Sequence, residues 1–148
     1  MTAPVRLRLR AADGDDIAVL SACLQDAVVP VADMAYLPGE ARFVMVANRF
    51  RWEDAGSEDV EGKIYERVHC GVCFDSVTAV RRKGLDRTRR SQILSLLALE
   101  AGEGYIDLVF AAGVVIRLEV AQIMCHLDDI DEPWPTQWRP AHRLGDGG

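Results

Sequence analysis

The chain has 148 residues, of which 49% are hydrophobic and 27% are charged, and its formal net charge at pH 7 is −6. This composition excludes a disordered, collagen-like or coiled-coil chain, and the length suits one hydrophobic core, so we expect a single domain over residues 1–148. No uncharged run exceeds nine residues, whereas a membrane-spanning helix needs about 18 or more. The first ten residues lack the apolar region of a signal peptide, so we expect a soluble protein of the cytoplasm, without membrane contact and with reduced cysteines.

The N-terminal residues predict a strand followed by a helix. Apolar and charged residues alternate over Val5–Arg10, which is typical of a half-buried strand. Asp13 is a candidate N-cap, and apolar residues recur at helical spacing after it, which predicts a helix over 14–26. Pro30 disfavours helix at the residue before it, so residues 28–31 are expected to be extended.

The next segment predicts a hairpin and a loop. Residues 34–37 and 42–52 are rich in β-branched and aromatic residues, and Pro38–Gly39 between them suits the centre of a tight turn. Residues 53–62 carry five acids, two glycines and a serine, which indicates a solvated loop.

The middle of the chain predicts more strands. A strand is expected from Val68 to about Val80, with its core face formed by Val68, Cys70, Val72 and Phe74. The apolar run 93–99 suits a buried strand better than a short helix, because glycines follow it closely. Residues 105–110 and 114–120 flank Ala111–Gly113 and predict a second hairpin, in which Ile116, Leu118 and Val120 face the core.

The C-terminal part leaves two alternatives open. Residues 120–130 have apolar residues at helical spacing, but a strand with Cys125 and Leu127 on one face fits as well. The tail from about 133 to 148 has too many prolines for a helix or a central strand, and its end is expected to be flexible. The sum is an α+β fold, mainly an antiparallel sheet of about seven strands with one early helix and, in one alternative, a short helix near the C-terminus.

Cysteine and histidine gather at 69–73 and at Cys125–His126, which raises the question of a zinc site. In a strand, Cys70 and Cys73 point to opposite faces, and so do the adjacent Cys125 and His126. We therefore expect no metal site and no cofactor, and we interpret Cys70 and Cys125 as small core residues.

The segment 81–90 is the strongest local charge feature. Six basic residues stand against Asp86, which gives a local charge of +5 and leaves −11 for the remainder. The favoured interpretation is a solvated turn between strands. The alternative is a contact for an anion or an acidic partner, made by Arg81, Arg82, Lys83, Arg87, Arg89 and Arg90.

Catalytic signatures are not found. The three histidines are His69, His126 and His142, and no serine lies in a G-x-S-x-G elbow, so no catalytic residue is assigned. Trp134 and Trp138 lie between prolines in the tail, where they either cover an open sheet edge, which we favour, or form an interface.

Several runs of the chain resemble a known family. They are Arg67–His69, Phe74–Arg81 followed by Lys83–Asp86, Leu94–Ala98, Ile116–Val120, Pro133–Thr136 and Trp138–His142. Together they are similar to an alphaproteobacterial family of small proteins that is catalogued as a domain of unknown function. The resemblance spans most of the chain but implies no catalytic or binding residue, and the cysteines lie outside its motifs.

Three hypotheses for function follow. The first is a non-enzymatic binding domain that contacts a protein partner or a second copy of itself through sheet edges, the basic turn and the tail with Trp134 and Trp138. The second is anion or nucleic-acid binding through the basic segment 81–90, which is disfavoured because the pI is about 5.0 and aromatic residues are not interleaved with the arginines. The third is an enzyme that uses His69 or His126.

Overall fold

The computed structural model describes residues 7–50, 65–86, 88–89, 91–130 and 134–136. Within these residues the chain forms one α-helix and an eleven-stranded sheet in which all paired strands are antiparallel. The elements are β1 (Arg8–Ala11), α1 (Gly14–Cys23), β2 (Val28–Pro30), β3 (Met34–Leu37), β4 (Arg42–Phe50), β5 (Tyr65–Phe74), β6 (Val77–Lys83), β7 (Ile93–Gly102), β8 (Tyr105–Phe110), β9 (Val115–Val120), β10 (Cys125–Asp129) and β11 (Trp134–Thr136).

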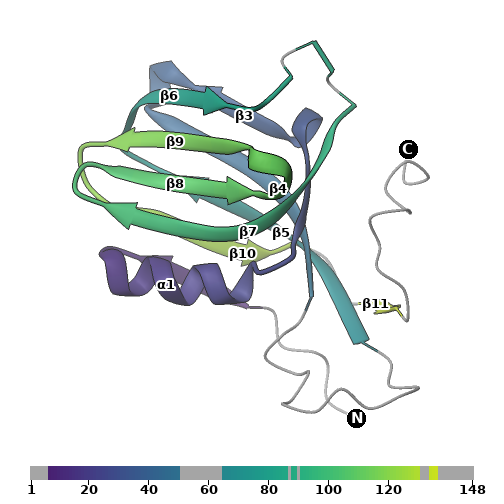
Figure 1. Ribbon diagram of the computed structural model, residues 1–148. Coiled ribbons are helices and arrows are strands. Elements are labelled where there is room, and N and C mark those ends of the chain that lie inside the picture. Colours follow the sequence, from purple (N-terminus) through teal and green to yellow (C-terminus); the bar gives the residue numbers. More distant parts are fainter. Residues whose placement is uncertain (1–6, 51–64, 87, 90, 131–133, 137–148) are drawn as a thin grey trace.

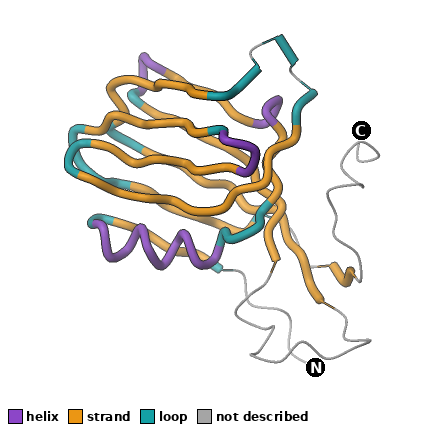
Figure 2. The backbone as a smooth tube through the Cα atoms, in the orientation of Figure 1, coloured by secondary structure: helices purple, strands orange, loops and turns teal. Residues whose placement is uncertain are grey.

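The sheet is bent into two layers. Figure 1 shows β6, β9, β8 and β7 in one layer, with β3, β4, β5 and β10 behind it and α1 along one open side. The tube view in Figure 2 shows the same two layers as strands joined by short turns. Alternate residues of both layers point inward and form one hydrophobic core.

The layers are joined in two places. Strand β2 pairs with β4 of one layer and with β7 of the other. At the second place the chain passes from β5 into β6 through Asp75 and Ser76, while β9 passes into β10 through residues 121–124. Two hydrogen bonds tie these crossings together, from Asp75 N–H to the Met124 carbonyl (2.8 Å) and from Ala121 N–H to the Ser76 carbonyl (2.9 Å).

Helix α1 closes the side between β7 and β1. The Asp13 side chain accepts a hydrogen bond from Asp16 N–H (2.8 Å), which confirms the predicted N-cap. Ile17 and Leu20 are buried, and the Ser21 hydroxyl accepts the Leu99 N–H (2.9 Å). The helix therefore covers part of the edge of β7 that no described strand covers.

Most of the predicted segments are confirmed. The early helix, both hairpins, the extended residues 28–30 and the strand over 93–99 are present, whereas Val31, expected to be extended, begins a 3-10 turn. The predicted core faces of β5 and β9 are buried, and so are Cys70 and Cys125. All four cysteines are free thiols.

Several predictions are wrong in detail. The sheet has eleven strands in the described residues and not about seven, because short strands such as β2, β10 and β11 pair with the ends of longer ones. The helix ends at Cys23 and not at 26, since Asp26 takes a positive φ of 62° and its N–H bonds to β7. The strand expected from Val68 to Val80 is broken at Ser76, whose φ is 61°.

The helix alternative for residues 120–130 is also wrong, because this segment contains β10. Cys125 and Leu127 lie in the core and alternate with the half-buried His126 and Asp128. Pairing with β5 on one side and β1 on the other supplies the backbone hydrogen bonds that outweigh the helical spacing.

The C-terminal tail contributes one short strand. The backbone of β11 pairs with residues 65–67 of β5, just beyond the end of the β10 pairing. This placement on a sheet edge is compatible with Pro135, which cannot donate a hydrogen bond. The predicted loop 53–62, Trp138 and the frayed end lie outside the described residues. The interface role of Trp134 and Trp138 stays a prediction.

No helix of the described residues is long and apolar enough to cross a lipid bilayer.

One ion pair lies inside the core. Arg49 of β4 is fully buried and donates to both carboxylate oxygens of Asp129 of β10, at 3.0 and 2.8 Å. Arg49 also donates to the Phe50 carbonyl (3.0 Å), and Asp129 accepts the Leu7 N–H (2.9 Å). Strand β5 lies between β4 and β10, so this bidentate pair spans it on the core side.

Removal of one partner should therefore be costly. We expect Arg49→Met to lower the free energy of unfolding by about 3–5 kcal/mol, because it leaves the Asp129 carboxylate buried without its counter-charge. The double variant Arg49→Met/Asp129→Leu should regain at least half of that loss. Urea denaturation followed by circular dichroism measures both values, and a double variant at least as unstable as the single one would contradict the ion-pair interpretation.

Candidate functional site

The strongest cluster of chemically active side chains lies on the outer face of the β5–β10 pair. Cys73 of β5 is directly opposite His126 of β10, and Asp75 follows two residues after Cys73. All three are half-buried, and one metal-ligating atom from each lies within 4.8 Å of the others. A thiol, a carboxyl and an imidazole thus share one small region of the surface.

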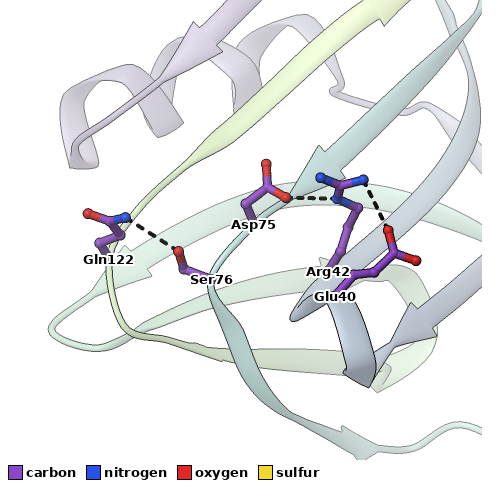
Figure 3. A network of polar contacts seen from close by, with 5 residues as sticks. All are labelled: Glu40, Arg42, Asp75, Ser76 and Gln122. Atoms are coloured by element: carbon purple, nitrogen blue, oxygen red, sulfur yellow. Dashed lines mark hydrogen bonds and ion pairs between the residues drawn. The ribbon is translucent and has the colours of Figure 1, made fainter.

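Asp75 is held in place by its neighbours. Arg42, the first residue of β4, donates from Nε to Asp75 Oδ1 at 2.8 Å, and its Nη1 lies 3.5 Å from Glu40 Oε1. Figure 3 shows this chain of charges, with the Ser76 hydroxyl turned to Gln122 on the other side. The hydrogen bond to Asp75 raises the pKa of the Arg42 guanidinium. In the described residues, Asp75 Oδ2 has no hydrogen-bond partner.

The protonation of Cys73 limits its chemistry. Burial raises the pKa of its thiol, and the Asp75 charge raises it further, against the opposing effect of Arg42. A nucleophilic cysteine needs a lowered thiol pKa, so a catalytic Cys–His pair is not favoured here. Cys70 is more extreme, since burial raises its pKa to about 12.

The sequence placed the cysteines and histidines on the correct faces of their strands, but it did not predict that Cys73, Asp75 and His126 lie close together. Cys70 and Cys73 do lie on opposite faces, and so do Cys125 and His126. The pairing of β5 with β10 brings Cys73 and His126 together. Only the strand alternative for residues 120–130 could have indicated this pairing. His69 lies on the same face as Cys73 but four residues away, about 13 Å along the strand, and His142 is outside the described residues.

The basic segment is divided between a strand and a turn. Arg81, Arg82 and Lys83 are exposed at the end of β6, and Arg89 is exposed after the turn. The remaining two, Arg87 and Arg90, lie outside the described residues. In the described sheet β6 pairs with β9 alone. At its other edge Val77 bonds to Ala41 and Tyr36, and no described strand pairs with the residues that follow.

The charges on this layer are only partly neutralised. Arg81 forms an ion pair with Glu119. Arg117, which lies opposite Arg81 on β9, donates to both carboxylate oxygens of Asp107, at 2.7 and 2.9 Å. For Arg82 and Lys83 the described residues supply no ion-pair partner. Within β6 these two exposed cations are available to a binding partner.

Contacts of its own residues hold the turn after β6 in shape. Gly84 has a φ of +79°, and a Cβ there would meet the Gly113 carbonyl oxygen at 2.5 Å. The Asp86 carboxylate accepts hydrogen bonds from the N–H and hydroxyl of Thr88, which lower its pKa. This supports the turn interpretation for the described residues Gly84–Asp86 and Thr88, and leaves the strand residues as the candidate contact.

In the part of the chain that the structure describes, the protein is thus a mainly antiparallel two-layered sheet with one α-helix, a basic sheet edge and a thiol–carboxyl–imidazole cluster. The model of a family described as "Protein of unknown function (DUF2948)" matches residues 7–142, and the chain belongs to this family. Comparison with curated proteins and comparison with solved structures each find no match.

The burial of the thiols predicts their order of reaction. With iodoacetamide in the native protein, Cys23 and Cys73 should be alkylated, and Cys70 and Cys125 should react only after unfolding. Because the pKa of Cys73 is raised, its thiolate fraction and its alkylation rate should rise at a higher pH than those of the unfolded chain. Peptide mapping by mass spectrometry over a pH series measures both, and rapid native alkylation of Cys70 would contradict the described packing.

Proposed function

We propose that this protein is a non-enzymatic binding domain of the cytoplasm whose β6 edge binds an acidic, extended protein segment. The observation that carries the proposal is a strand edge that no other described strand pairs with beyond Val77, together with Arg82 and Lys83, two exposed cations, at its end. The four free thiols support a reducing compartment.

An open strand edge offers a row of backbone donors and acceptors to an incoming strand. Peptides bind other domains by adding a strand in this way, with main-chain hydrogen bonds giving affinity and side chains giving specificity. On β6 the side chains that would read the incoming strand are basic, and they alternate between the two faces of the strand. An acidic segment would therefore gain both kinds of contact.

The same charges disfavour a second copy of β6 as the occupant. Antiparallel pairing of two β6 strands centred on Arg82 would place Arg82 against Arg82 and Arg81 against Lys83, and directly opposed like charges are destabilising. Pairing over the whole strand would need the edge at Val77, whose N–H already bonds to the Ala41 carbonyl. Basic residues on an exposed edge commonly prevent self-pairing. A homodimer would have to use another surface.

Nucleic acid is the weaker alternative. Outside 81–90 the chain carries a charge of −11, which repels a phosphate backbone once more than a few nucleotides are engaged. A short acidic peptide contacts only the edge and avoids most of that repulsion.

The test is a fluorescence-anisotropy titration with a labelled peptide of alternating Glu and Val. We expect binding that weakens at high salt and that falls about tenfold or more in Arg82→Glu/Lys83→Glu, since two favourable charge pairs become repulsive. Arg10→Glu, an exposed charge reversal on β1 in the other layer, is the matched control and should bind normally.

Two further ligands distinguish strand addition at the β6 edge from electrostatic attraction alone. The same peptide with an N-methyl group on every backbone amide should lose binding, because neither of its edges can donate to the β6 edge. If the N-methylated peptide binds as tightly as the unmodified one, strand addition is wrong. If single-stranded RNA binds more tightly than the acidic peptide, the choice of partner is wrong.

A further inference from the structure

We propose that Cys73, Asp75 and His126 bind one Zn²⁺ ion and leave its fourth position open to water or a small ligand. Their thiolate, carboxylate and imidazole groups are the three ligand types that Zn²⁺ takes in proteins. The site is independent of the β6 edge, because it lies on the outer face of the other layer.

The geometry requires only a small adjustment. Tetrahedral ligands at about 2.0–2.3 Å from Zn²⁺ lie about 3.3–3.8 Å from one another. The three ligand atoms already lie within 4.8 Å, so a closure of about 1 Å is enough. Half-buried side chains can make that movement by small rotations, while the paired backbone of β5 and β10 stays in register.

The surrounding charges balance an ion of charge +2. A Cys73 thiolate and the Asp75 carboxylate neutralise it, and the nearby Arg42 and Glu40 cancel each other. The displaced thiol proton leaves for solvent when the metal–sulfur bond forms, as is general for cysteine ligation. The ion, its ligands, Arg42 and Glu40 then carry no net charge together, and Arg10, opposite His126 on β1, adds one exposed positive charge beside them.

The hydrogen bond from Arg42 holds the Asp75 carboxylate in one orientation. Arg42 donates to Asp75 Oδ1, which fixes the carboxyl group and leaves Oδ2 for the metal. Hydrogen bonds of this kind hold ligands in place at known metal sites. Asp75 also follows β5 at the point where its N–H bonds to Met124, so its backbone is anchored to the segment that leads to His126.

The ligand types select the class of metal. One sulfur, one nitrogen and one oxygen donor suit Zn²⁺ and its neighbours in the first transition row. Ca²⁺ and Mg²⁺ prefer sites made of oxygen alone, and the cluster offers only one carboxylate. Zn²⁺ is therefore the expected ion, and Mg²⁺ should not compete with it.

The experiment uses Co²⁺ as a spectroscopic substitute for Zn²⁺ in the full-length protein. Titration with Co²⁺ should produce a thiolate-to-cobalt charge-transfer band that saturates at one ion per chain and disappears when Zn²⁺ is added. Cys73→Ser should abolish the band. Cys23→Ser is the matched control, since Cys23 is the other half-buried thiol, and it should leave the band unchanged.

Two more variants test the other ligands. Asp75→Asn and His126→Asn should each weaken Zn²⁺ binding, measured by competition with a chromophoric chelator, by at least about tenfold, the smallest loss typical even of an outer-shell partner. His69→Asn should have no effect. Circular dichroism confirms that each variant is folded. A charge-transfer band that persists in Cys73→Ser, or no band in the folded wild-type protein, would overturn the proposal.

Discussion

The bidentate contact between Arg49 and Asp129 is the constraint on which the arrangement of the back layer depends. Both groups are buried, so each needs the other, and they meet only if β4 and β10 flank β5 in the observed register. A shift of β10 by one residue would turn Asp129 outward and His126 into the core. The ion pair therefore also sets the face on which His126 meets Cys73. A charge pair in the core fixes the chemistry of the outer surface, although the two sites do not touch.

The corner between the layers has a comparable effect at the other end of β5. Ser76 takes a positive φ, and Val77 N–H bonds to the carbonyl of Ala41, which is itself in the left-handed region. These backbone contacts bring the start of β4 against the end of β5. As a result Arg42 reaches the half-buried Asp75 at the point where the chain leaves β5. The bend thus places a fixed, charged group at the rim of a regular sheet.

Much of the fold can be predicted from sequence because its signals are local. Alternation of apolar residues identified the core faces of β5 and β9, and Asp13 marked the start of the helix. The missed features are long-range. Residues 120–130 satisfy a helical pattern and a strand pattern equally, and only their neighbours β5 and β1 decide between them. Arg49 and Asp129 resemble ordinary polar residues until pairing buries them, and Cys73 and His126 are 53 positions apart in the chain.

The two proposed sites bind their ligands through different kinds of interaction, so experiments can distinguish them. At the β6 edge the cations are exposed, so attraction to an acidic segment acts through water and is screened by salt within about 8–10 Å. At the cluster the ligands are half-buried and binding is by coordination, with the nearby charges of Arg42 and Glu40 opposed to each other. Ionic strength should therefore act mainly on the first site, whereas competition among metal ions should act only on the second. The net charge of −6 hides both features: it is the sum of a basic strand end and an acidic remainder, and neither the edge nor the cluster can be inferred from it.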